Sequence, residues 1–143
     1  MSNLVLIVRL AGQRVAIRAD LVASVVELDE ISPVPRAPPH IAGLAALRSR
    51  VLTVVDAYRA LGIPGPAEPG REAIVVEIEG HHYAITVDGV DDVVDADVEA
   101  IATGPLMRGG WGRIAAGSVE ADGDMLLLVE VAALVAGAEA LAA

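Results

Sequence analysis

Residue types that commonly carry catalysis or bind metals are few in this chain. It has no cysteine and 3 histidines, and all 10 of its basic residues are arginine. Without thiols there is no Cys-based zinc site and no thiol nucleophile. His81 and His82 are adjacent, and strand neighbours point to opposite faces, so the pair is poorly placed to ligate one metal. His40 lies far away in sequence, after a proline-rich stretch. We expect no metal and no cofactor.

The acidic segment 88–99 has the composition of a calcium loop but not its spacing. An EF-hand loop needs oxygen ligands at positions one, three and five, followed by glycine at six, and no register of this segment supplies them. Its valines instead fit the packed side of a strand, with the acids mainly on the solvated side. Asp20 and Asp88 each fall between two expected strands, where a role in a turn or bulge explains them.

Sequence motifs of the common enzyme classes are missing. Gly117-Ser118 is followed by Val119-Glu120, so there is no Gly-x-Ser-x-Gly nucleophile turn. A phosphate-binding loop of the GxxxxGK type requires a lysine, and no dinucleotide fingerprint follows a strand. We therefore expect no catalytic residues and a protein that is not an enzyme.

The overall composition narrows the choice of partners. The chain has 143 residues, 55% of them hydrophobic, and a formal net charge of −10. The hydrophobic content predicts a folded domain, and the negative charge disfavours both nucleic acid and anionic membrane surfaces as partners. No basic segment precedes an apolar run at the N-terminus, and no apolar stretch is long enough for a membrane helix. We expect a cytoplasmic protein without direct membrane insertion.

The first half of the chain reads as five short strands and a helical turn. Val, Leu and Ile enrichment and short length favour strands over helices, at 4–10, 13–17, 22–28, 43–47 and 51–55. The stretch 32–39 contains four prolines, which remove backbone donors and predict an extended loop. Asp56 has the position of an N-cap for a helical turn that ends at Gly62.

The pattern then starts again. After the Gly/Pro-rich stretch 62–70, strands are expected at 73–78, 82–87, 90–95, 113–120 and 125–129, with a helix at 131–141. Seven of the fifteen positions from 12 to 26 are identical to those from 80 to 94, which indicates an internal repeat. The extra residues of the second half fall near 103–112.

This repeat predicts an all-β protein of two similar lobes. Five short strands suit a small barrel, which hides its sheet edges by closure. We expect two five-stranded SH3-like barrels packed side by side, with short helical turns and a C-terminal helix. We expect residues 1–143 to form a single domain, with lobe one at about 4–62, a connector at 62–72 and lobe two at about 73–136.

The segment 41–56 carries two charges in an otherwise apolar hairpin, because Arg48 and Arg50 lie at its turn. Two solvated turn charges would explain them. A functional role is also open, in which a guanidinium orders the hairpin or bonds a partner through bidentate hydrogen bonds.

This segment resembles the CheW family of chemotaxis coupling proteins. The family pattern is a Gly, an apolar residue and Asn-Leu-Arg-Gly, then an apolar run with Pro-Val-Ile-Asp-Leu; this chain has Gly43-Leu44-Ala45-Ala46-Leu47-Arg48-Ser49 and Thr53-Val54-Val55-Asp56-Ala57. In the second half, Val87-Asp88-Gly89-Val90-Asp91-Asp92-Val93 matches the family's Val-Asp-x-Val-x-x-Val stretch. The proline-containing loop before Gly43 matches as well, and the likeness spans about residues 4–135.

The resemblance implies a double-barrel fold and a non-enzymatic adaptor. Such proteins join the cytoplasmic tip of a chemoreceptor to the regulatory domain of a CheA-type histidine kinase, at the membrane-associated array. Carried over by position, Arg48 is the signature arginine, Gly43 opens the same strand beside Leu44, and Val22 is an apolar position associated with partner contact. We expect Arg48 to order the hairpin through buried bonds rather than to bond the partner.

Departures from the family pattern leave other functions open. Ala46, Ser49, Thr53 and Ala57 replace the family's Asn, Gly, Pro and Leu, and Glu130 replaces the second-half Asp. An adaptor of a non-flagellar pathway that binds only the kinase is one alternative. A small-molecule-binding double barrel is an alternative of a different class.

Overall fold

A computed structural model describes residues 2–66, 70–99, 111, 114–121 and 123–142. These described residues form ten strands, two α-helices and one 3-10 helix. In order these are β1 (Ser2–Leu10), β2 (Gln13–Arg18), η1 (Ala19–Leu21), β3 (Val22–Glu27), β4 (Ile41–Leu47), β5 (Arg50–Val55), α1 (Ala57–Leu61), β6 (Glu72–Ile78), β7 (His81–Thr86), β8 (Gly89–Glu99), β9 (Ala115–Ala121), β10 (Asp124–Val129) and α2 (Val131–Ala142).

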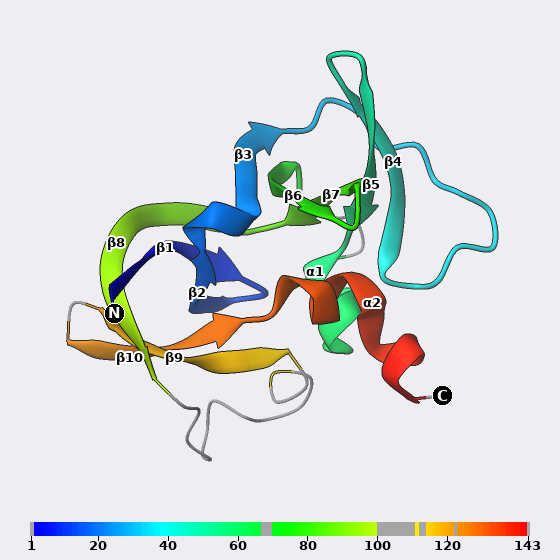
Figure 1. The fold of residues 1–143 in the computed structure, drawn as a ribbon. Coiled ribbons are helices and arrows are strands. Elements are labelled where there is room, and N and C mark those ends of the chain that lie inside the picture. Colours follow the sequence, from blue (N-terminus) through cyan, green and yellow to red (C-terminus); the bar gives the residue numbers. More distant parts are fainter. Residues whose placement is uncertain (1, 67–69, 100–110, 112–113, 122, 143) are drawn as a thin grey trace.

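The strands build two five-stranded sheets, which confirms the predicted all-β class (Figure 1). The first sheet is a closed barrel with the order β1-β2-β10-β9-β8, and the second has the order β3-β6-β7-β5-β4. The expected extra segment at 103–112 lies outside the described residues except for Trp111, which is buried.

Each sheet combines strands from both halves of the chain. The barrel takes β1 and β2 from the first half and β8 to β10 from the second, and the other sheet takes the remaining five. The predicted division into contiguous lobes at 4–62 and 73–136 is therefore wrong for the sheets. The physical reason is the long antiparallel ladder from Ser2↔Asp97 to Arg9↔Gly89, which joins β1 to β8. Two parallel strand pairs, β2 with β10 and β5 with β7, also join strands from different halves of the chain. We call this mixing of the halves the exchange of strands.

The second sheet repeats the strand order of the barrel but leaves a gap. If β6, β7, β5, β4 and β3 are matched to β1, β2, β10, β9 and β8, the circular order is the same. In the barrel β8 pairs with β9, whereas no ladder joins β3 to β4 among the described residues. The proline-containing loop between β3 and β4 bonds to the free edge of β4 instead, because Ser32 and Leu44 exchange two backbone hydrogen bonds of 2.8 and 2.9 Å.

Successive side chains along a strand pack into different hydrophobic cores, because they point to opposite sides of the sheet. One apolar cluster fills the barrel, a second lines the inner side of the other sheet, and the largest lies between the two sheets. On β5, for example, Leu52 and Val54 face the inner side of their sheet, while Val55 joins the core between the sheets. This shared wall holds the sheets together, and it also holds Trp111.

The two helices cover one end of the molecule and contact each other (Figure 1). Asp56 caps α1 as predicted, since its carboxylate accepts hydrogen bonds from the backbone N–H groups of Tyr58 and Arg59 at 3.0 and 3.4 Å. Gly62 ends α1 at a φ of 71°, a conformation that glycine adopts without strain. His40 is buried, and its Nε2 bonds the carbonyl of Val135 in α2 at 2.8 Å, so the loop before β4 is tied to this helix.

Candidate protein-binding surfaces

The outer side of the β4–β5 hairpin carries exposed apolar side chains. Alternation along paired strands places Leu44 and Ala46 of β4 beside Thr53 and Val51 of β5. Leu44 is 39% exposed and Val51 is 63% exposed, whereas Leu52 on the opposite side of the sheet is fully buried. We call Leu44, Ala46, Arg48 and Val51 the hairpin surface. Neighbouring exposed apolar side chains are common at protein–protein interfaces, so this is a candidate binding surface.

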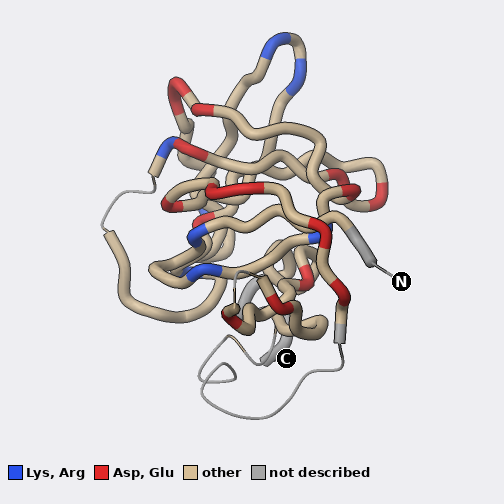
Figure 2. The backbone as a smooth tube through the Cα atoms, turned by 90° about the vertical axis from the view of Figure 1, so that its left-hand side faces the viewer, with Lys and Arg blue, Asp and Glu red and all other residues tan. Residues whose placement is uncertain are grey.

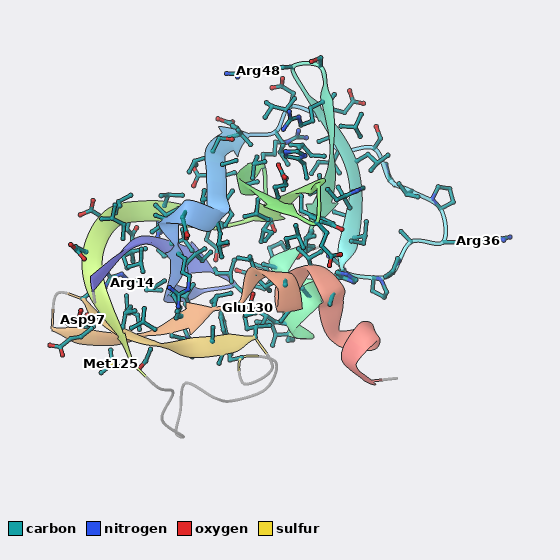
Figure 3. All side chains as sticks on the ribbon, viewed as in Figure 1. Arg14, Arg36, Arg48, Asp97, Met125 and Glu130 are labelled. Atoms are coloured by element: carbon teal, nitrogen blue, oxygen red, sulfur yellow. The ribbon has the colours of Figure 1, made fainter. Side chains whose placement is uncertain are left out.

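Arg48 lies at the tip of the hairpin and points away from the body of the molecule (Figure 3). Its φ of 58° lies in the left-handed region, as the first residue of a two-residue turn closed by the pair Leu47↔Arg50. Its guanidinium has no hydrogen bond or ion pair with any residue the structure describes. The expectation that Arg48 orders the hairpin through buried bonds is wrong, because the side chain is exposed. Among the described residues, its donors therefore have no acceptor.

Gly43 is buried and serves the loop before β4. A Cβ atom at this position would lie 2.3 Å from the carbonyl oxygen of Ser32, and its φ is 151°. Glycine therefore permits the loop to approach β4 closely enough for the two Ser32–Leu44 hydrogen bonds. Gly43 thus affects the hairpin surface indirectly, through the position of this loop. Its neighbour Leu44 is the residue that faces solvent.

A second apolar surface lies on β1, η1, β3 and β8. Its members are the exposed side chains of Leu4, Leu21, Val25 and Val93. We call it the inter-sheet surface because β1 and β8 belong to one sheet and β3 to the other. Leu4 and Val93 lie diagonally on one ladder, since Leu6 pairs with Val93 and Leu4 with Asp95.

Val22 is only partly available at the inter-sheet surface. Its side chain is half-buried and packs against the core between the sheets, whereas Val25 on the same strand is 46% exposed. Sequence reasoning missed Val25, Val51, Leu4 and Val93. For Val51 the signal was present, because strict alternation with the buried Leu52 places Val51 on the outer side.

Charges are distributed unevenly over the described chain. Arg9, Arg14 and Arg59 form ion pairs with carboxylates, of which the shortest is Arg59 Nη1–Asp56 Oδ2 at 2.6 Å. Figure 2 shows a different situation at the top of the molecule, where the tip of the β4–β5 hairpin is marked in blue with no red on the tip itself. The hairpin tip is a cationic feature in a chain whose net charge is −10.

Asp88 is used structurally, in the turn between β7 and β8. Its carboxylate accepts a hydrogen bond from the backbone N–H of Gly12 at 2.7 Å and one from the Tyr58 hydroxyl at 3.2 Å. These contacts lie at a pocket of about 250 Å³ that Asp56 and Thr86 also line. Burial, together with the negative charges of Asp88 and Asp56, raises the pKa of Tyr58 above its usual value. The hydroxyl therefore stays protonated as a hydrogen-bond donor.

Within the described ranges, no three His, Asp or Glu side chains gather in a way that could hold a metal ion. Of the helices that the structure describes, neither is long and apolar enough to cross a membrane.

Exposed apolar side chains on an all-β fold without a metal cluster among its described residues are typical of a protein-interaction module. A family model described as CheW-like domain matches residues 4–139. The chain belongs to this family of CheW-like domains.

Named relatives agree with this assignment. The chain is 29% identical over 102 residues to a chemotaxis protein CheW of Rhizobium meliloti, covering 70% of this chain and 66% of that protein, slightly under two thirds of its length. It is 31% identical over 112 residues to a probable chemotaxis protein CheW of Rhizobium etli, covering 76% and 72%. The crystal structure of the scaffolding protein TtCheW from Thermoanaerobacter tengcongensis matches in fold with a TM-score of 0.75, at 24% identity over 90% of this chain and 84% of that one.

Proposed function

We propose that this protein is a non-enzymatic adaptor that couples a chemoreceptor to a CheA-type histidine kinase. It would bind the regulatory domain of the kinase with one surface and the cytoplasmic tip of the receptor with another, at the membrane-associated array. Family membership supports the class of partner. The observation that carries the proposal is the presence of two groups of exposed apolar side chains, one on β4 and β5 and the other on β1, η1, β3 and β8.

The separation of the surfaces supports simultaneous binding. The hairpin surface lies on β4 and β5, while the inter-sheet surface lies on β1, η1, β3 and β8. Figure 1 draws β1 and β8 on the left and β4 and β5 on the upper right, with β3 between them. A stable protein interface covers roughly 800 Å² on each partner. The two surfaces share no residue, so each can be assigned to a different partner, which an adaptor requires.

The test measures binding to each partner with one variant for each surface. Purified protein is titrated by calorimetry with the regulatory domain of a CheA from the same cell and with a receptor tip fragment. Val51→Glu places a charge on the hairpin surface, and Val25→Glu places one on the inter-sheet surface. Met125→Glu is the matched control, because Met125 on β10 is 46% exposed and outside both surfaces.

Each surface variant should weaken one partner at least tenfold, about 1.4 kcal/mol, and leave the other within threefold. Met125→Glu should bind both partners like the wild type. Binding of the kinase domain alone would favour the kinase-only adaptor. Binding of neither partner would remove the coupling role. The small-molecule alternative is supported only if a ligand saturates the pocket beside Tyr58 while both proteins fail to bind.

A further inference from the structure

The chain passes from one sheet to the other at two points. The first crossing is η1, which leads from β2 of the barrel to β3, and the second is the turn between β7 and β8. The internal repeat aligns these crossings, because Asp20 of η1 has the same place in segment 12–26 as Asp88 has in segment 80–94. The two aspartates differ in the bonds that they make.

Asp88 is bonded to elements that belong to both sheets. Its carboxylate accepts hydrogen bonds from the backbone N–H of Gly12 at 2.7 Å and from the Tyr58 hydroxyl at 3.2 Å. Gly12 lies in the β1–β2 turn of the barrel, whereas Tyr58 lies in α1, which follows β5 of the second sheet. The backbone N–H of Asp88 also donates to the carbonyl of Arg9 at 2.7 Å. One side chain therefore connects the end of the barrel with the helix of the second sheet.

Asp20 makes no comparable connection at the other crossing. It is exposed, and its carboxylate has no hydrogen bond or ion pair with any residue in the described part of the chain. Without the bonds of Asp88, a change in the angle between the sheets would therefore turn about η1.

The core between the sheets does not fix this angle by itself. Its buried members are Val, Leu, Ile and Ala side chains together with Trp111. Contacts between apolar side chains hold two surfaces together without a preferred direction. A hydrogen bond depends on both distance and angle, and one that a carboxylate accepts is among the stronger kinds. The bonds of Asp88 thus add a directional restraint to a core that has little of its own.

The angle between the sheets matters for one of the two candidate surfaces. In the inter-sheet surface, Leu4 and Val93 belong to the barrel and Val25 belongs to the second sheet. The hairpin surface lies on β4 and β5 alone, so a rotation of one sheet against the other leaves it unchanged. Asp88 itself lies outside the inter-sheet surface, because the five positions that separate it from Val93 span about 16 Å of extended strand.

We propose that Asp88 is a positioning residue that sets the angle between the two sheets and thereby the shape of the inter-sheet surface. The inference rests on the proposed function, because it concerns the partner that binds this surface. It gives Asp88 an effect on binding that needs no contact with the partner.

The decisive variant is Asp88→Ala, and Asp88→Asn is its matched control. Alanine removes both hydrogen bonds of the carboxylate. Asparagine loses the same charge but keeps a side-chain oxygen that accepts hydrogen bonds from Gly12 and Tyr58. Urea unfolding verifies that both variants are folded. Calorimetry then measures their affinity for the kinase regulatory domain and for the receptor tip fragment, and the partner of the inter-sheet surface is the one that Val25→Glu weakens.

Asp88→Ala should weaken the partner of the inter-sheet surface about tenfold and leave the partner of the hairpin surface within about threefold of wild type. Asp88→Asn should bind both partners within about threefold of wild type. Equal losses for the two partners would overturn the inference, because they would indicate a general loss of stability. Equal losses for Asp88→Ala and Asp88→Asn would also overturn it, because they would indicate an effect of charge alone.

A distance measurement tests the angle without any partner. The chain has no cysteine, so one nitroxide label can be attached at Met125→Cys of the barrel and a second at Ala46→Cys of β4, both of which are exposed positions. In this doubly labelled protein, Asp88→Ala should shift or broaden the distribution of distances between the labels, and Asp88→Asn should leave it unchanged. Identical distributions with Asp, Asn and Ala at this position would overturn the inference. Failure of the wild type to bind either partner would overturn the proposed function, while the label distances would still test the role of Asp88.

Discussion

Replacing Gly43 with alanine should destabilise the protein by about 2–4 kcal/mol. An alanine Cβ would lie 2.3 Å from the Ser32 carbonyl oxygen and 2.7 Å from its carbonyl carbon, both backbone atoms that no rotamer change can move. The loop must retreat, which breaks the two Ser32–Leu44 hydrogen bonds at about 0.5–1.5 kcal/mol each. The positive φ of Gly43 adds about 1 kcal/mol for any residue with a Cβ.

The assay is urea unfolding at 25 °C followed by far-UV circular dichroism, with Gly80→Ala as the matched control. Gly80 also has a positive φ, of 81°, but a Cβ there would meet nothing within 4 Å. It should therefore cost only the conformational term, about 1 kcal/mol. Equal losses in the two variants would refute the reasoning, because they would show that contact with Ser32 contributes nothing. A receptor or kinase binding assay on Gly43→Ala then tests whether the loop shapes the hairpin surface.

Three further predictions concern the end of the molecule near the helices. Asp56→Ala should lower the free energy of unfolding by about 2–3 kcal/mol, because it removes the N-cap and the 2.6 Å ion pair with Arg59. Asp56→Asn keeps the cap and should therefore lower it less in the same urea assay. Tyr58→Phe should become more stable relative to wild type as pH rises above about 10, since the raised pKa of Tyr58 means that the folded state holds its proton more tightly than the unfolded chain does; curves with a constant difference across that range would contradict this. His40→Ala should destabilise by about 2 kcal/mol and increase amide exchange in α2, because it removes a buried ring and its bond to that helix; unchanged exchange in α2 would show that the bond does not anchor the helix.

The individual strands and helices were predictable from the sequence, but the pairing of the strands into sheets was not. Short runs of Val, Ile and Leu define strands, the prolines at 33–39 exclude both helix and sheet interior, and Asp56 with Gly62 brackets α1. These signals depend on a few adjacent residues. The exchange of strands between halves depends on which of two similar strands meets β1, and an internal repeat makes both choices look alike.

The exposed residues of the candidate surfaces were also only partly predictable from the sequence. Leu44 and Arg48 are both exposed, although buried bonds were expected for Arg48. Val22 was singled out, yet Val25 is the more exposed valine on β3. The register shift between Val22 and Ser24 interrupts the two-residue period, so alternation counted from Val22 assigns the following side chains to the wrong sides. A single bulge of this kind has no signature in a strand of valines, alanine and serine.

The exchange of strands also has a consequence for how the chain is made. When a ribosome has released only residues 1–62, β1 and β2 have no β8 or β10 to pair with, and β3 and β5 lack β6 and β7. The nascent first half therefore has unpaired edges on both of its future sheets and cannot complete either core. Folding has to wait for most of the polypeptide, and the two halves then become ordered together. Separately expressed fragments 1–66 and 70–143 should each be unfolded alone and regain the native fold only when mixed.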